Sequence, residues 1–224
     1  MTDHEDPGDD APSGAHPSGV DPCDAGPREA FPVAGLLLAA GGGRRLGGRP
    51  KALLTHRGRP LVEHTAGELL AAGCARVHVV LGARADTVRE RAELAGCALV
   101  ENPEWERGMG SSLRAGLDSL AGTGARAALV SLVDQPGIGA AAMARVLAAC
   151  RGEESLASAA YDGVRGHPVL FGSAHWAGIA ESATGDRGAR AYLRAHAQSV
   201  TLVECGDVAR PYDIDTEDDL VHLE

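Results

Sequence analysis

The sequence predicts an α/β fold in which helices cover both faces of a mostly parallel β-sheet, a three-layer α/β/α architecture. Two observations support this prediction. Short apolar runs with the length of buried strands alternate with segments in which apolar residues recur at helical spacing. Parallel strands need a crossover between them, usually a helix, so this alternation is typical of a sheet that is covered on both sides.

Four strands are expected in the first half of the chain, each an apolar run bounded by residues that end strands. They span residues 33–40, 76–81, 98–101 and 126–133. A helix is expected after Pro60, because proline fits the first turn of a helix, and Gly73 ends it. Asp86 opens the next helix, and Ser111 or Ser112 is the expected cap of the third.

The second half of the chain is less regular. In chain order, the expected elements are a helix over 140–150, strands over 156–161 and 166–171, a helix from residue 175, a helix through 193–196 and a strand over 200–203. The turn at Asp162 and Gly163 joins the two middle strands. Thr216 is the expected N-cap of a terminal helix.

The negative charge of the chain is concentrated at its N-terminus. Residues 1–32 contain eight acidic residues and one arginine, which accounts for −7 of the total net charge of −10. Residues 1–31 also contain five prolines, with glycines and serines between them. Such a composition buries too little apolar surface to offset the entropy lost on ordering. We therefore expect residues 1–31 to form a disordered acidic tail and residues 32–224 to form one domain.

The composition argues against several classes of protein. The net charge of −10 argues against nucleic-acid binding. The five cysteines occur singly, which argues against a metal knuckle and favours a reducing compartment. The N-terminus lacks the basic region followed by an apolar core that is typical of a signal peptide. No apolar run approaches the ~18 residues of a membrane span. We expect a cytoplasmic protein without nucleic-acid or membrane partners.

A glycine-rich loop after the first strand is the most informative motif. It contains three consecutive glycines and, close behind them, three cations: Gly41, Gly42, Gly43, Arg44, Arg45 and Lys51. Glycine lets backbone N–H groups approach an anion closely, so the loop is typical of a phosphate cradle. Its spacing matches neither the dinucleotide fingerprint nor the P-loop. A glycine-rich turn with two solvated arginines is the alternative.

Two further positions are candidates for binding. Asp134 follows the strand over 126–133, at the edge of an open α/β sheet where ligands bind. A carboxylate there suits Mg²⁺ that also contacts substrate phosphates, and a solvated turn residue is the alternative. The helix start at Ser111 and Ser112 is a candidate site for an anion or a base edge, and an ordinary cap is its alternative.

Six ordered blocks between Val33 and Leu220 resemble the MobA-like NTP transferase family. They cover residues 38–51, 102–116, 134–136, 166–168, 185–190 and 213–216. Within the family, the chain looks most like the molybdenum cofactor cytidylyltransferases and the related guanylyltransferases, although Gly43 and Leu46 depart from the usual serine and methionine. The resemblance implies a Rossmann-like nucleotidyltransferase fold with a mostly parallel sheet.

The resemblance also implies an activity. An Mg²⁺-dependent enzyme would transfer a nucleoside monophosphate from an NTP, with CTP favoured, to a phosphorylated acceptor such as molybdopterin, and release pyrophosphate. A molybdoenzyme or chaperone partner follows from the same resemblance. Relatives named nicotine blue oxidoreductase share Pro50 before Lys51, so an NAD(P)H-dependent pigment reductase on this fold is an alternative. A non-catalytic protein that binds a nucleotide or molybdopterin is another.

The same resemblance assigns roles to individual residues. Arg45, Lys51 and Asp134 would be catalytic, and Asp134 and Asp215 would hold Mg²⁺. The nucleotide would contact Leu38, Ala39, Ala40, Gly41, Gly42, Gly43, Arg45, Lys51, Asn102, Ser111 and Ser112. The acceptor would contact His167, Asp186 and Arg187. Packing at a strand edge is the alternative for His167. Pairing with Asp186 and Glu181 on a helix surface is the alternative for Arg187 and Arg190.

Overall fold

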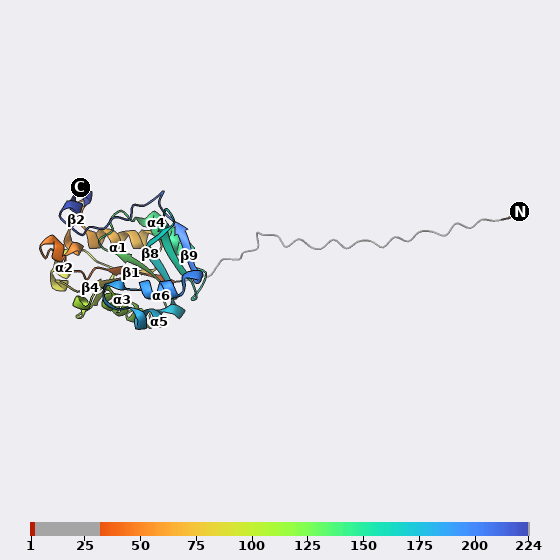
Figure 1. The fold of residues 1–224 in the computed structure, drawn as a ribbon, viewed down its shortest axis with the longest axis horizontal. Coiled ribbons are helices and arrows are strands. Elements are labelled where there is room, and N and C mark those ends of the chain that lie inside the picture. The colour runs from red at the N-terminus through yellow and green to blue at the C-terminus, as the bar shows by residue number, and fades with distance from the viewer. Residues whose placement is uncertain (3–31, 224) are drawn as a thin grey trace. The chain divides into compact units, whose positions relative to one another are not determined.

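The computed structural model describes residues 1–2 and 32–223, and residues 32–223 have the expected three-layer α/β/α fold (Figure 1). The expected tail, residues 1–31, lies outside the described residues except for Met1 and Thr2. In residues 32–223, seven strands form one sheet in the order β5-β4-β1-β6-β8-β7-β9. Their bounds are β1 Val33–Leu38, β4 Arg76–Leu81, β5 Ala98–Glu101, β6 Ala127–Leu132, β7 Leu156–Tyr161, β8 Val164–Gly172 and β9 Val200–Glu204. A separate two-stranded ribbon pairs β2 (Thr55–His56) with β3 (Arg59–Pro60).

Helices cover both faces of this sheet (Figure 1). One face packs against α1 (Leu61–Ala71), α2 (Ala85–Arg91) and α4 (Ala140–Ala148), and the other against α3 (Met109–Asp118), α5 (Trp176–Ser182) and α6 (Arg190–Ala195). Alternate residues of the central strands face opposite cores, as Leu36 and Leu37 of β1 do. Both are fully buried, which explains why the sequence of β1 is continuously apolar. No helix in the described part of the chain is long and apolar enough to cross a bilayer.

The antiparallel strand β8 brings part of the second half of the chain to the ligand-binding edge of the sheet. It runs against its neighbours β6 and β7, whereas β1, β4, β5 and β6 are parallel. Val130 of β6 pairs with Val169 of β8, the last pair of this ladder, and His167 lies two residues before Val169, where the charge of Asp134 acts on it. The beginning of β8 therefore lies beside the carboxyl ends of β1, β6 and β7.

The predicted start of one helix was wrong. Helix α3 begins at Met109, and its N-cap is Gly108, so Ser111 and Ser112 lie inside the first turn. Gly108 has a φ of 94°, and a Cβ there would lie 2.4 Å from the Asp186 carboxylate, which requires glycine. The expected terminal helix is present as a 3-10 helix, Asp218–Leu223.

Candidate active site

A cleft of about 1290 Å³ opens at the carboxyl ends of β1, β6 and β7. Most of the residues expected to bind substrate line it: Leu38, Ala40, Gly41, Gly42, Arg45, Lys51, Ser112, Asp134, His167, Asp186, Arg187 and Asp215. Four others do not: Ala39, Gly43, Asn102 and Ser111. The structure thus brings residues from both halves of the chain to one cavity, as the phosphate-cradle hypothesis requires.

The glycine loop presents unused backbone donors to this cleft. The chain leaves the sheet after Leu38, two residues before the expected strand end, and enters the loop. Within residues 32–223, the backbone N–H groups of Gly41 and Gly42 donate to no hydrogen-bond acceptor. Gly43 has a φ of 58°, and a Cβ at this position would lie 1.9 Å from the carbonyl oxygen of Arg49. Gly43 therefore shapes the loop, while Gly41 and Gly42 leave N–H groups for an anion.

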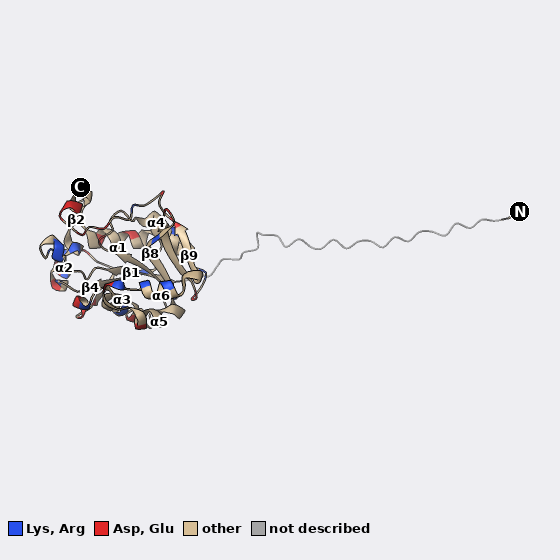
Figure 2. Ribbon diagram, in the orientation of Figure 1, with Lys and Arg blue, Asp and Glu red and all other residues tan. Residues whose placement is uncertain are grey.

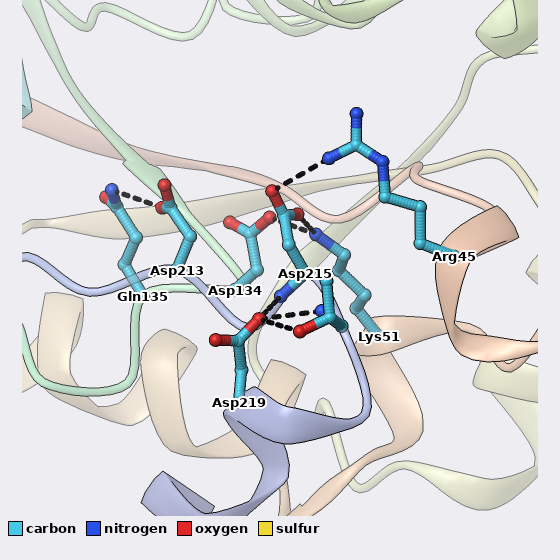
Figure 3. A network of polar contacts seen from close by, with 8 residues as sticks. Arg45, Lys51, Asp134, Gln135, Asp213, Asp215 and Asp219 are labelled. Carbon is cyan, nitrogen blue, oxygen red and sulfur yellow. Dashed lines mark hydrogen bonds and ion pairs between the residues drawn. The ribbon is translucent and has the colours of Figure 1, made fainter.

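Lys51 lies between two carboxylates of the cleft (Figure 3). Its ammonium Nζ is 2.7 Å from Asp134 Oδ2 and also contacts Asp215 Oδ1. The Lys51 side chain is 13% exposed, against 22% for Asp134 and 43% for Asp215. Arg45 contacts the other oxygen of Asp215, with 3.4 Å between Nη1 and Oδ2. These side chains come from the glycine loop, the end of β6 and the segment after β9.

Electrostatic contacts keep Lys51 charged. Its partial burial alone would lower the pKa of the ammonium, but the charges and hydrogen bonds of Asp134 and Asp215 outweigh burial and raise the pKa above its usual value. Lys51 is therefore a permanent cation in the physiological pH range. A fixed cation of this kind suits the charge that develops on a reacting phosphate.

The segment that carries Asp215 is held by its own backbone. The N–H of Ile214 donates to the carbonyl oxygen of Asp134 at 2.9 Å, and the Ile214 side chain is fully buried. The Asp219 carboxylate accepts hydrogen bonds from the backbone N–H groups of Asp215 and Thr216, at 3.0 and 2.7 Å (Figure 3). These bonds lower the pKa of Asp219. The Thr216 hydroxyl also donates to Asp219, so it does not accept a backbone N–H as the expected N-cap would.

Sequence reasoning missed two polar residues at the same rim. Gln135 Nε2 donates to Asp213 Oδ1 at 2.8 Å, and the buried Oε1 of Gln135 has no partner among the described residues (Figure 3). Burial, and to a smaller degree the charges of Asp134 and Asp215, raise the pKa of Asp213. The alternation of Asp213 and Asp215 was the available signal, because residues two apart in an extended chain face the same side.

His167 lies next to this carboxylate group, at the start of β8, and lines the cleft. Burial lowers the pKa of His167 to about 4; nearby Asp134 opposes this effect and Arg190 adds to it. The imidazole is therefore neutral at pH 7. In that state it offers one hydrogen-bond donor and one acceptor to a ligand.

Asn102, Ser111 and Ser112 form an internal brace. The Nδ2 group of Asn102 donates to the hydroxyls of Ser111 and Ser112 at 2.9 and 3.1 Å, and its Oδ1 accepts from the backbone of Glu104. All three side chains are buried, and Ser112 alone among them lines the cleft. The loop that they hold carries Trp105, an aromatic cleft residue that the sequence analysis did not single out.

Asp186 and Arg187 lie in a 3-10 turn, Gly185–Arg187, at the other end of the cleft. Both side chains are exposed, and within the described residues no ion pair joins them. The alternative, pairing of Arg187 and Arg190 with Asp186 and Glu181, likewise has no ion pair among the described residues. Asp186 and Arg187 both face the cavity.

The carboxylates of Asp134 and Asp215 have the chemistry that a hard divalent cation needs. They converge on one point, which Lys51 Nζ occupies here, and both are partly open to the cleft. Mg²⁺ and similar cations in phosphate-binding sites take one or two protein carboxylates and complete their shell with phosphates and waters. The donor set therefore fits a cation that arrives together with a nucleotide.

Sequence comparison identifies relatives of the chain. The model of the MobA-like NTP transferase domain matches residues 35–200. The nicotine blue oxidoreductase of Paenarthrobacter nicotinovorans is 42% identical over 198 residues, which cover 85% of this chain and 96% of the relative. The molybdenum cofactor guanylyltransferase of Cereibacter sphaeroides is 38% identical over 136 residues, 60% of this chain and 65% of the relative.

Solved structures agree with this assignment. The homologue of Mycobacterium tuberculosis Rv0371c from Mycobacterium sp. strain JC1 is 32% identical, with a TM-score of 0.71 over 85% of this chain and 94% of that one. Rv0371c of M. tuberculosis, in a complex with manganese, is 26% identical, with a TM-score of 0.68 over 86% of this chain and 97% of that one. The match over residues 35–200 and the 42% identical relative show that the chain belongs to the MobA-like NTP transferase family.

Proposed function

We propose that the protein transfers a nucleoside monophosphate from an NTP, with CTP as the favoured donor, to a phosphorylated small molecule such as molybdopterin, and that it uses Mg²⁺. The observation that carries the proposal is the position of Lys51. Its ammonium lies between Asp134 and Asp215, in the same cleft as the unused N–H groups of Gly41 and Gly42. Fixed donors, a fixed cation and two carboxylates together match a metal-bound triphosphate.

Each part of this arrangement has a task in the proposed reaction. The N–H groups of Gly41 and Gly42 bind phosphate oxygens of the NTP. Arg45 and Lys51 neutralise charge at the α-phosphate and on the departing pyrophosphate. Asp134 and Asp215 hold the divalent cation, which supplies charge neutralisation and orients the phosphates. Lys51 exchanges its carboxylate partners for phosphate oxygens when the metal–nucleotide complex binds.

The reaction needs no strong general base. A phosphate oxygen of the acceptor is already an anion, and it attacks the α-phosphorus in line. The bond from the α-phosphorus to the acceptor oxygen forms, and the bond to pyrophosphate breaks. His167 is neutral at pH 7 and lies beside Asp134 at the start of β8, so it can donate a hydrogen bond to the acceptor phosphate without becoming its base.

The nucleotide would lie on the side of the cleft formed by β1 and α3. Leu38 and Ala40 line that side, together with Ser112 and Trp105. Asn102 and Ser111 act through Ser112 and the Trp105 loop, because their own polar groups are bonded internally. A guanylyltransferase among the relatives makes GTP the second candidate donor.

A pyrophosphate-release assay tests the proposal. Full-length protein is incubated with molybdopterin, Mg²⁺ or Mn²⁺, and ATP, CTP, GTP or UTP in turn. We expect pyrophosphate only when a metal is present, and fastest with CTP. The proposal fails if no nucleotide releases pyrophosphate with either metal.

The second candidate function is reduction of a pigment with NAD(P)H. The nicotine blue oxidoreductase match favours it, because it spans 96% of that relative. NAD(P)H oxidation in the presence of a quinonoid pigment, without pyrophosphate release, would support this second function. Nucleotide binding with neither activity would instead indicate a non-catalytic binding protein.

A further inference from the structure

The charged groups that the proposed reaction uses lie outside the strands of the sheet. In Figure 2, lysine, arginine, aspartate and glutamate are concentrated on the helices and loops around the sheet, and the strands are mostly tan. Residues 39–43 belong to no strand or helix, and the N–H groups of Gly41 and Gly42 donate to no acceptor within residues 32–223. Sheet or helix hydrogen bonds therefore do not fix these two donors, so packing must hold them.

The indole of Trp105 packs against the glycine loop at Gly42. A Cβ at Gly42 would lie 3.1 Å from Cζ3 and 3.2 Å from Cη2 of Trp105, closer than the roughly 3.5 Å at which carbon atoms pack. Gly42 does not have the positive φ that Gly43 has, so its backbone conformation is open to other residues. The indole is therefore what requires a glycine at this position.

A second glycine holds the near end of the Trp105 side chain. A Cβ at Gly82, in the connection between β4 and α2, would lie 2.7 Å from Cγ of Trp105 and closer still to its Cβ. The backbone N–H of Trp105 donates to the carbonyl oxygen of Asn102 at 3.3 Å, and its carbonyl oxygen accepts from Gly108 at 3.0 Å. The indole thus has a fixed position between the connection after β4 and the glycine loop.

No hydrogen bond explains the position of this indole. Its Nε1 donates to no acceptor among the described residues. By contrast, Nε1 of Trp176, the other tryptophan of the chain, donates to the carbonyl oxygen of Phe171 at 3.0 Å. Trp105 lines the cleft together with Gly42, and Trp176 does not. These contacts indicate a role that Trp105 exerts by packing on the glycine loop.

We propose that Trp105 is a positioning residue for the phosphates of the NTP, because its indole holds Gly42 in the position in which the Gly42 N–H binds phosphate. The proposal rests on the proposed function, since it takes the N–H groups of Gly41 and Gly42 as donors to the NTP. Donors that are fixed before a ligand arrives lose less freedom on binding, so they bind more tightly. Trp105 acts through Gly42 and needs no contact of its own with the nucleotide.

Binding of two ligands tests the proposal. Inorganic tripolyphosphate has phosphates but no nucleoside, and a non-hydrolysable CTP analogue has both; each is titrated with Mg²⁺ into full-length protein by calorimetry. Trp105→Phe removes the ring atoms that contact Gly42 and keeps an aromatic side chain. We expect it to weaken the binding of both ligands about tenfold, the loss of about one charge-assisted hydrogen bond. Weaker binding of the CTP analogue alone would mean that Trp105 contacts the nucleoside, and would overturn the proposal.

A compensating substitution tests the contact itself. Gly42→Ala alone should also weaken the binding of both ligands about tenfold, because the new Cβ meets the indole. In the double variant Trp105→Phe/Gly42→Ala, the methyl group takes the space that the shorter ring leaves, and its next neighbour is Ala83 Cβ at 3.4 Å. We expect the double variant to bind both ligands within about threefold of the unmodified protein. A loss equal to the product of the two single losses would overturn the proposal, since independent sites behave in that way.

A matched control and a stability measurement exclude a purely structural effect. Trp176→Phe is the same substitution outside the cleft, and it should leave the Kd of both ligands unchanged. The Tm of every variant is measured in parallel. A lower Tm with unchanged Kd values in Trp105→Phe would show that Trp105 only stabilises the fold, and would overturn the proposal. If Trp105→Phe does not fold, unchanged Kd values in Gly42→Ala would overturn it instead.

Pyrophosphate release separates this proposal from the proposed function. If no NTP releases pyrophosphate but tripolyphosphate binding depends on Trp105 and recovers in the double variant, the positioning role stands and the transfer reaction is lost. If pyrophosphate is released and both single variants bind tripolyphosphate as the unmodified protein does, the transferase stands and the positioning role is refuted.

Discussion

Replacing Asp134 by asparagine tests whether the negative charge of this side chain is needed for the proposed reaction. Asparagine has nearly the same shape, so the substitution removes one negative charge beside Lys51 Nζ, 2.7 Å away, and leaves Asp215 as its partner. A metal that polarises a phosphoryl oxygen is worth several kcal/mol in the transition state. Loss of about 3–4 kcal/mol corresponds to roughly 10²- to 10³-fold in rate, at about 1.4 kcal/mol per factor of ten.

The stability of the variant should change much less than its activity. Lys51 keeps one carboxylate partner, and removal of Asp134 reduces repulsion among three neighbouring aspartates. We expect the free energy of unfolding to change by less than about 1 kcal/mol, as for partly exposed ion pairs. For a domain of this size, that is a shift in Tm of less than about 4 °C. A large fall in rate without a large fall in Tm therefore identifies a chemical role.

The assay is pyrophosphate release over a range of Mg²⁺ concentrations, with nucleotide binding measured separately in EDTA. Asp134→Asn should bind nucleotide normally without metal and should require more Mg²⁺ for its residual activity. Asp162→Asn is the matched control, because Asp162 lines the same cleft outside the Lys51 contacts and asparagine tolerates its positive φ of 52°. An unchanged rate in Asp134→Asn, or an equal loss in Asp162→Asn, would refute the role of Asp134.

Three other predictions follow from the site and its scaffold. Lys51→Met should lower kcat about 100-fold with little change in KM for the NTP, since it removes transition-state charge stabilisation, whereas a rise in KM alone would make Lys51 a uniform binder. Gly43→Ala should destabilise the protein by about 1–3 kcal/mol in chemical denaturation, because Gly43 has a φ of 58° and a Cβ there would clash with Arg49. The control is Gly67→Ala, on the open face of α1, which should be neutral or stabilising. Equal effects of the two substitutions would contradict this reasoning. Because the pKa of His167 is about 4 when folded and 6.5 when unfolded, the stability it contributes in metal-free protein is present above pH 6.5 and is lost as the pH falls toward 4, by at most about 3 kcal/mol. His167→Gln should flatten that part of the stability curve, and an unchanged slope would show that His167 is not the group responsible.

The strands were predictable where a local pattern determines them. The expected strands over 76–81, 98–101 and 156–161 coincide with β4, β5 and β7, because each apolar run is bounded by polar or glycine residues. The direction of β8 was not predictable, since a strand pattern is the same in either direction. That direction decides which end of β8 reaches the cleft, and so decides that His167 lies beside Asp134.

The site was predictable as a set of residues but not as a set of contacts. The glycine loop and a strand end located Lys51 and Asp134 separately, and Asp215 came from the family resemblance alone. Their convergence depends on tertiary contacts. Lys51 is 83 positions from Asp134 and 164 positions from Asp215 in the sequence, so no local pattern contains these contacts. The burial of Ser111 and Asn102 was not predictable either, because it also depends on the tertiary structure. Gly108 caps α3 three or four residues earlier than Ser111 or Ser112 would, and the hydroxyl of Ser111 is turned inward.

The most direct test of the central claim is a crystal structure of the protein with Mn²⁺ and a non-hydrolysable CTP analogue, with the metal located by anomalous scattering. We expect a manganese peak that Asp134 and Asp215 both ligate, with Lys51 Nζ moved onto the phosphates and the N–H groups of Gly41 and Gly42 bonded to them. A triphosphate bound elsewhere, or Lys51 still between the two carboxylates with manganese absent from them, would contradict it.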